Sequence, residues 1–230
     1  MNTLIVKFKN PLQKRELPMF RGAVVSTMGN QCPLLFHNHQ GDGLRYSYPL
    51  IQYKCLRGKA AIVCVGDGCE EIGAYFCNGD FHLRLGEERD EAFEIDAIHP
   101  HRTMVQVWND TFNYHLRDWL PFNADNYHQY LQLQGVVERT QFLEKILVGN
   151  ILSACKGLDV FIEGAISCKI VQFSDPKKSY HKGVPLMGFD LDFVTNISLP
   201  DYIGLGKGAS LGHGVLNKKI YKNPNIETEK

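Results

Sequence analysis

Residues 204 to 214 read Gly-Leu-Gly-Lys-Gly-Ala-Ser-Leu-Gly-His-Gly, and this stretch lies between two apolar segments that are typical of β-strands. Because glycine costs backbone entropy and fills no core, five glycines in eleven residues indicate backbone angles that other residues avoid, or the very close approach of another group. Successive backbone N–H groups in such turns form a concave anion site, and Lys207 adds positive charge. The stretch, which we call the glycine-rich loop, is therefore predicted to hold phosphate.

The spacing of these glycines argues against the two common nucleotide-binding loops. In a Walker A loop a Gly-Lys pair precedes Ser or Thr, but here Gly208 follows Lys207, so a magnesium ion would lack its hydroxyl ligand. The dinucleotide fingerprint opens a helix, whereas Gly214 leads into the strand-like Val215-Leu216. A mononucleotide or dinucleotide loop is therefore not expected.

The charges of the chain are distributed unevenly. Its formal net charge is zero, but basic residues exceed acidic ones in residues 1–59 and 169–222, and acidic residues dominate residues 67–96. If the fold brings the two basic regions together, they form one positive face that suits a nucleic acid. The alternative is that each region is only a solvated surface.

Several classes of protein are disfavoured by the composition. No apolar run approaches the roughly 18 to 20 residues of a membrane helix, and the first residues lack the apolar region of a signal peptide. The seven cysteines form no C-x-x-C pair and are interpreted as reduced thiols. His99, His101 and His181 lack a carboxylate or thiol at ligand spacing. We expect a cytoplasmic protein with no membrane partner, no metal and no cofactor.

The first hundred residues predict a β-α-β-β-α-β pattern. Apolar and alternating segments indicate strands, and a proline near the first turn marks the first helix. The expected order is a strand at 3–9, a helix at 17–25, strands at 48–54 and 59–65, a helix at 70–77 and a strand at 80–86. This is the ferredoxin-like plan.

The second half predicts a similar pattern with longer elements. The best helix runs from Val136 to Cys155, because its apolar residues recur at i, i+3 and i+4. The other expected features are strands around a turn at 109–110 within 103–119, strands at 159–173 and 184–197 separated by a polar loop at 175–182, and a last strand at 214–221.

We therefore predict an α+β protein with two tandem ferredoxin-like modules. The expected boundaries are residues 1–100 for the N-terminal module, 101–222 for the C-terminal module with the glycine-rich loop, and 223–230 for a tail. A single larger α+β sheet is the alternative.

A tandem ferredoxin-like protein with a glycine-rich loop before its last strand resembles the RAMP superfamily of CRISPR-associated proteins. Leu35-Phe36-His37-Asn38-His39, the segment from Arg45 to Lys54 and the glycine-rich loop are similar to the CRISPR repeat-processing endoribonucleases, in particular to their b-type branch. The resemblance implies an enzyme that cuts CRISPR repeat RNA once per repeat without metal. It also implies a catalytic histidine in the first module and an RNA backbone held by the glycine-rich loop.

The residues in these segments suit RNA cleavage by the neighbouring 2′-hydroxyl, which needs two proton transfers and stabilisation of the phosphorane. Histidine titrates near neutrality and can serve either transfer. His39 is the first candidate because it stands seven residues before Tyr46 at the start of a glycine-containing turn, and His37 is its rival. Tyr46 could orient the 2′-hydroxyl, and Lys54 could neutralise developing phosphate charge.

The expected RNA-binding residues lie in the same two segments and in the polar loop at 175–182. They are Arg45, Tyr48, Lys177, Lys178, Gly204, Gly206, Lys207, Gly208, Ser210, Gly212, His213 and Gly214. CRISPR repeat RNA is the expected partner. Other CRISPR-associated proteins and a second copy of the chain are further partners compatible with the resemblance.

Two other functions compete with the endoribonuclease. One is a non-catalytic RNA-binding RAMP subunit of a CRISPR effector complex, since a ferredoxin-like sheet with basic flanks suits that role. The other is a metabolic enzyme that binds a phosphorylated small molecule on the glycine-rich loop. Salt-sensitive binding to RNA but not to nucleotides would exclude the metabolic enzyme.

Overall fold

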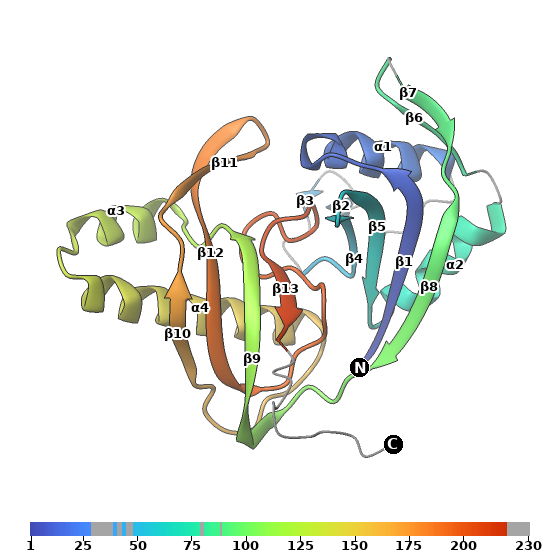
Figure 1. Cartoon of the computed structure of the whole chain (residues 1–230). Helices are drawn as coiled ribbons and strands as arrows, with labels where there is room; N and C mark the ends of the chain where they lie inside the picture. The colour runs from blue at the N-terminus through green and yellow to red at the C-terminus, as the bar shows by residue number, and fades with distance from the viewer. Residues whose placement is uncertain (29–38, 41–42, 45–47, 79–80, 88, 220–230) are drawn as a thin grey trace, which may run out of the picture.

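The computed structural model describes residues 1–28, 39–40, 43–44, 48–78, 81–87 and 89–219, with only the backbone for residues 39, 40, 43, 44 and 78. Figure 1 shows two sheets that diverge from a common base, where the first module passes into the second. Both modules combine a sheet with helices, which confirms the predicted α+β class with two ferredoxin-like modules.

The N-terminal module has a four-stranded antiparallel sheet in the order β4-β5-β1-β8. Numbered as consecutive strands, this is the order 2-3-1-4 of a ferredoxin-like fold. Its elements are β1 (Asn2–Pro11), the 3₁₀ turn η1 (Lys14–Glu16), α1 (Leu17–Thr27), β4 (Ile51–Leu56), β5 (Lys59–Val65), α2 (Gly68–Asn78) and β8 (Ile95–Arg102). Two hairpins project from it, β2 (His39–Gln40) with β3 (Gly43–Leu44), and β6 (His82–Leu85) with β7 (Arg89–Ala92).

The core of this module forms where α1 covers one face of the sheet. The helix starts with Pro18 in its first turn and buries Leu17, Phe20 and Val24. Phe20 stacks on Phe93 and packs edge to face on Phe8 of β1, with ring centroids 5.3 and 5.8 Å apart. Alternate β1 residues point the other way, so Lys7 lies on the face that the helices leave open.

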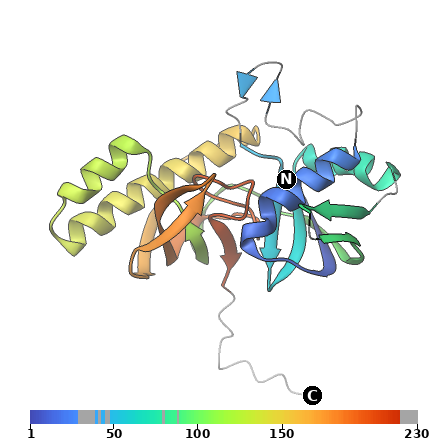
Figure 2. The same cartoon turned by 90° about the horizontal axis from the view of Figure 1, so that it is seen from above.

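The C-terminal module repeats the same strand order. Its path β10-β12-β9-β13 is again 2-3-1-4, and one further strand, β11, pairs with the free end of β12. The elements are β9 (Val107–Trp119), α3 (Ala124–Gln132), α4 (Val136–Gly157), β10 (Cys168–Phe173), β11 (Lys177–His181), β12 (Val184–Ile197) and β13 (Val215–Lys218). Leu143, Leu147 and Ile151 of α4 are buried in the core against β9 and β12, and Figure 2 shows α3 and α4 together beside this sheet.

Three predicted features of the fold are wrong. A strand does form near 80–86, but it belongs to the β6–β7 hairpin, and β8 is the fourth strand of the sheet. No turn interrupts β9 at 109–110, because β9 pairs with β12 along its length, from Trp119 opposite Phe189 to Val107 opposite Ile197.

The third error concerns the segment before β12. The strand expected at 159–173 begins only at Cys168, and the polar segment 175–182 contains β11 rather than only a loop. Helix α3 is not predicted from the sequence. Its N-terminus is capped by Asn123, whose side-chain Oδ1 accepts a hydrogen bond from the Asn126 N–H.

The glycine-rich loop takes the place of a second helix in the C-terminal module and runs between the two modules. It returns on itself, with Gly204 bridged to Val215 in an antiparallel sense, and Leu211 forms a parallel bridge with Tyr53 of β4. Gly214 has φ +59°, and a Cβ atom there would lie 1.9 Å from the Leu205 carbonyl oxygen. The backbone therefore approaches itself too closely for any other residue at this point.

Gly214→Ala is predicted to destabilise the protein far more than Gly183→Ala. Gly183 also has positive φ (+78°), but a Cβ atom there would have nothing within 4 Å. Gly183→Ala should therefore lower the unfolding free energy by only about 1 kcal/mol, because alanine is strained in the left-handed conformation. Gly214→Ala should lower it by roughly 2 kcal/mol more because of the clash. Denaturant unfolding of both variants measures the difference, and equal losses would contradict the packing described.

Candidate functional site

Four hydrogen bonds hold the glycine-rich loop against residues 48–54 of the first module. The Tyr48 hydroxyl donates to the Gly204 carbonyl (2.9 Å), and the Gly204 N–H donates to Gln52 Oε1 (2.8 Å). The Tyr53 N–H donates to the Ser210 carbonyl (2.8 Å), and Lys54 Nζ donates to the Ala209 carbonyl (2.7 Å). We call this set of contacts the clamp. The loop therefore lies along the outer edge of β4, where Leu211 forms a single parallel bridge with Tyr53.

Lys54 is the most unusual member of the clamp. Its side chain is 0% exposed, and burial, with a smaller contribution from the positive charge of Arg117, lowers the pKa of Lys54 to about 7. From the sequence, Lys54 is expected to neutralise charge that develops on the phosphate. The structure places its ammonium group inside the interface between the modules, bonded to the loop backbone.

Tyr48 is half-buried beside the same loop. A Cβ atom at Gly157, the last residue of α4, would lie 2.3 Å from Tyr48 Cβ, so this glycine is needed for the close approach of the helix end. Burial raises the pKa of the Tyr48 hydroxyl well above its usual range. Tyr48, one of the predicted RNA-binding residues, therefore lies between α4 and the glycine-rich loop.

The histidine segment is connected directly to the clamp. His39 lies on β2, whose backbone pairs with β3 (His39 opposite Leu44, Gln40 opposite Gly43). The hairpin precedes Tyr48 by only a few residues. The predicted residues His37, Arg45 and Tyr46 lie outside the described residues, as does the side chain of His39, and their roles stay predictions.

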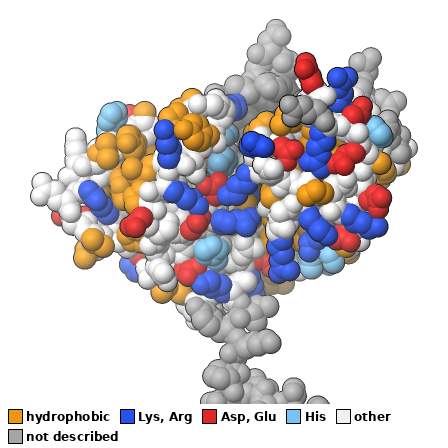
Figure 3. All heavy atoms as spheres, turned by 45° about the horizontal axis from the view of Figure 1, so that its top comes forward, with side chains coloured by type: hydrophobic (Ala, Val, Ile, Leu, Met, Phe, Trp, Pro, Cys, Tyr) orange, Lys and Arg blue, Asp and Glu red, His pale blue; other side chains and the backbone are white. Residues whose placement is uncertain are grey.

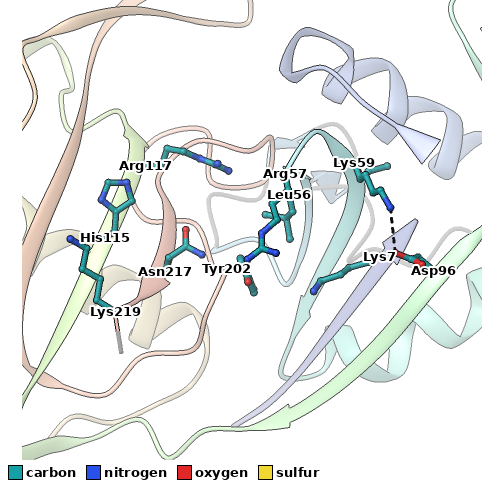
Figure 4. Close-up of a pocket in the computed structure, with 11 residues that line it drawn as sticks. Lys7, Leu56, Arg57, Lys59, Asp96, His115, Arg117, Tyr202, Asn217 and Lys219 are labelled. Carbon is teal, nitrogen blue, oxygen red and sulfur yellow. Dashed lines mark ion pairs between the residues drawn. The ribbon is translucent and has the colours of Figure 1, made fainter. Parts of the chain in front are cut away.

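A basic cleft of about 630 Å³ lies between the open faces of the two sheets. In Figure 4 the labelled side chains reach into it from both modules. Five of the lining residues are cationic and one is acidic; the cations are Lys7, Arg57, Lys59, Arg117 and Lys219, and the acid is Asp96. The fold thus brings together the two basic regions of the sequence, since three of these cations precede residue 60 and Lys219 follows residue 169.

Several of these cations already have partners. Lys59 pairs with Asp96 (3.6 Å), and Lys219 with Asp192 (2.5 Å). Arg117 differs, because its Nη2 donates to the Cys55 carbonyl (3.2 Å) while its buried Nε has no hydrogen-bond partner among the described residues. Arg117 therefore lines the cleft without a carboxylate partner in that part of the chain.

A second polar cluster joins the glycine-rich loop to the β11–β12 hairpin. At its centre is Asp118, a non-glycine residue with φ +54° whose side chain is 5% exposed. One carboxylate oxygen accepts from Ser179 Oγ (2.6 Å), and the other lies 2.8 Å from His213 Nδ1 and 3.4 Å from Lys14 Nζ of the first module. We call these four residues the Asp118 cluster.

The charge of Asp118 is well compensated. Burial alone would raise the pKa of Asp118, but hydrogen bonds from His213 and Ser179, together with the charge of Lys14, outweigh it and hold this pKa below its usual range. The Asp118 carboxylate therefore stays ionised at neutral pH, and the cluster joins four segments that are remote in sequence.

The remaining predicted RNA-binding residues lie around this cluster. Lys177 pairs with both carboxylate oxygens of Asp190 (2.7 Å each), and the Lys178 ammonium lies 5.3 Å from the centre of the Tyr180 ring. Lys207 is exposed beside Gly208, and Figure 3 shows Lys and Arg side chains gathered where the two modules meet. In the described part of the chain, no three His, Cys, Asp or Glu side chains are grouped so that they could hold a metal ion, and no helix there is long and apolar enough to cross a membrane.

Two family models together match almost the whole chain. The Cas6b N-terminal domain matches residues 1–103, and the Cas6b C-terminal domain matches residues 106–219. The chain belongs to the Cas6b family. The two matched ranges correspond to the two sheets of the structure, since β8 ends at Arg102 and β9 begins at Val107.

Individual relatives are similar to this chain over different lengths. Protein MJ0978 of Methanocaldococcus jannaschii is 38% identical over 96 residues, which are 42% of this chain and only 64% of the relative. A crystal structure of Cas6b is 25% identical with a TM-score of 0.82, over 95% of this chain and 100% of the other. That of a "CRISPR RNA processing endoribonuclease Cas6b" is 23% identical with a TM-score of 0.68, over the same shares.

Lys54→Met is predicted to change how stability depends on pH. Because folding lowers the pKa of Lys54 from 10.5 to about 7, the unfolded chain binds more protons between these values, and the wild type gains stability as pH rises through that window. The methionine variant lacks this gain. The difference in unfolding free energy between wild type and variant should shift in favour of the wild type by up to about 1.4 kcal/mol per pH unit. A difference independent of pH from about pH 7 to pH 9.5 would contradict the burial of a titrating lysine.

Proposed function

We propose that this protein is an endoribonuclease that cuts CRISPR repeat RNA. The observation that carries the proposal is the clamp, which fixes the glycine-rich loop to the segment that continues from the two histidines. A loop suited to phosphate is thus held beside residues 48–54, which follow the predicted proton-transfer segment in the sequence. The similarity to a protein described as a CRISPR RNA processing endoribonuclease supports the same substrate.

In the proposed reaction the 2′-oxygen attacks the adjacent phosphorus and the bond from phosphorus to the 5′-oxygen breaks. One group removes the proton of the 2′-hydroxyl and another donates a proton to the departing 5′-oxygen, so the products are a 2′,3′-cyclic phosphate and a 5′-hydroxyl. His39 is the first candidate for a proton transfer and His37 is its rival. Tyr46 would orient the 2′-hydroxyl, and no metal ion takes part in the scheme.

The binding of the RNA backbone is assigned to the basic cleft and to the glycine-rich loop. Lys7, Arg57 and Arg117 supply positive charge on the open sheet faces, and Lys207 lies exposed on the loop. Contacts of this kind position a nucleic acid through its phosphates rather than through its sequence. They place the strand so that one phosphate reaches the histidine segment.

Cleavage of a repeat RNA by the pure protein in excess EDTA tests the reaction. Wild type should cut, an RNA with a single 2′-deoxy nucleotide at the cut should stay intact, and His39→Ala should slow cleavage by roughly a hundredfold or more without loss of affinity. His128→Ala, on the exposed surface of α3, is the matched control and should cut normally.

Three results would contradict the proposal. They are loss of cleavage in EDTA, cleavage of the deoxy substrate at the normal rate, and full activity of both the His39→Ala and the His37→Ala variants. Tight RNA binding by a wild-type protein that never cuts would instead support an RNA-binding subunit without activity.

Arg117→Gln is predicted to weaken RNA binding because it removes a charge from the cleft. The dissociation constant should rise by about tenfold, and the slope of its logarithm against the logarithm of salt concentration should fall by about one unit. Arg84→Gln on the exposed β6 strand, remote from the cleft, should leave both values unchanged. Equal behaviour of the two variants in fluorescence anisotropy titrations would remove the cleft from the RNA path.

A further inference from the structure

A small hollow lies where the two sheets converge, at the bottom of the molecule in Figure 1. It has a volume of about 190 Å³ and lies at the ends of four strands, with Thr3 near the start of β1, Arg102 at the end of β8, Ser198 just after β12 and Lys218 at the end of β13. We call it the strand-end hollow. Tyr202 lines both this hollow and the basic cleft of about 630 Å³, so the two spaces adjoin each other.

The Thr3 hydroxyl is a polar group in this hollow that needs a partner. Thr3 is only 3% exposed, and its Oγ1 has no hydrogen-bond partner in the part of the chain that the structure describes. Because Thr3 of β1 pairs with His101 of β8, both share the open face of the first sheet with Lys7. A buried hydroxyl without a partner costs free energy. A ligand in the hollow would remove that cost.

Aromatic rings line the same hollow from both modules. Tyr202 has φ +65°, and its N–H donates to the Leu216 carbonyl of β13 (2.7 Å). Such backbone strain clusters at binding sites. Figure 4 shows Tyr202 at the cleft, where Lys7 Nζ lies 6.0 Å from the centre of its ring. From the first module, the His101 ring stacks on that of His99 with centroids 6.3 Å apart. Flat rings of this kind are surfaces on which an unpaired nucleobase stacks.

The charges at the rim suit the backbone of a nucleic acid. Arg102 and Lys218 are exposed, and neither forms an ion pair with a described carboxylate. The Lys218 ammonium instead lies 5.1 Å from the centre of the Phe112 ring. Among the described lining residues the single acid is Asp201, whose Oδ1 accepts from the Lys218 backbone N–H (2.5 Å). The hollow therefore combines cations at its rim with a ring and an unpaired hydroxyl in its wall.

We propose that the strand-end hollow binds one unpaired nucleobase of the RNA, with Tyr202 as the stacking surface and the Thr3 hydroxyl as hydrogen-bond partner of the base edge. The proposal rests on the proposed function, because the strand in the basic cleft supplies the base. The hollow shares no described lining residue with the clamp or the glycine-rich loop, so this contact is separate from the phosphate at the cut. Thr3 and Tyr202 are then specificity-determining residues, since contacts to bases make binding depend on sequence and contacts to phosphates do not.

Thr3→Val separates a binding role from a structural one. Valine has nearly the shape of threonine without the hydroxyl, so the protein without RNA should be as stable as wild type or more stable. RNA affinity should nevertheless fall about fivefold, because the base loses a hydrogen bond. Thr140→Val on α4, where the hydroxyl bonds only within the helix, is the matched control and should leave RNA affinity unchanged. Thermal unfolding and fluorescence anisotropy measure the two quantities.

A set of repeat RNAs identifies the base that enters the hollow. Each RNA carries a 2′-deoxy nucleotide at the cut and one abasic nucleotide at a different position. For the wild type, one abasic position away from the cut should weaken binding by about tenfold. Thr3→Val should reduce this penalty to about twofold at that position only, because the variant has already lost the hydrogen bond. Tyr202→Leu should reduce it as well, because it removes the stacking surface.

Failure of this proposal and failure of the proposed function are distinguishable. If the wild type binds the RNA but no abasic position away from the cut weakens binding, or if Thr3→Val keeps the full penalty at every position, the hollow is refuted while the proposed function stands. A clear loss of stability in Thr3→Val also refutes it, because the hydroxyl would then have a structural partner. If the wild type binds no RNA, both proposals fail.

Discussion

The architecture depends on the contact between the glycine-rich loop and β4. Ferredoxin-like sheets are stable units, but the contact makes a joint surface from two of them, with Lys54 and Gln52 buried completely at the interface. Buried polar groups of this kind are expensive unless each finds a partner. Here the loop carbonyls and one loop N–H supply the partners, so the interface specifies one relative position of the modules.

This constraint explains why the loop is rich in glycine. The chain must turn back on itself within eleven residues, approach β4 closely enough to form a bridge, and still leave room for the rings of His181 and His213. A side chain at Gly204 would meet Ala209, and one at Gly208 would meet the two histidines. The glycines therefore serve the packing of the loop as much as the approach of a phosphate.

Periodicity was sufficient to predict β1, β4, β5 and α4, because each buries one face or the whole of an apolar segment, and Pro18 near the first turn marked α1. It failed for α3, whose sequence ADNYHQYLQ buries only Tyr130, and for β11, a polar strand at the sheet edge. The family and the candidate histidine segment were identified only from the resemblance to the CRISPR repeat-processing endoribonucleases. The Asp118 cluster could not be predicted as a unit, because its members are far apart in sequence and meet only through the fold. Of its four residues, only His213 stood out in the sequence, because it lies between two glycines.

In the proposed complex one RNA strand contacts the histidine segment and the glycine-rich loop at the same time. Cross-linking can show this, with a photoreactive thiouridine placed beside the cut in a 2′-deoxy repeat RNA and mass spectrometry of the linked peptides. Cross-links are expected both to residues 37–48 and to residues 204–214. Cross-links confined to one of these segments, or to the far surfaces of the helices, would contradict a single composite site.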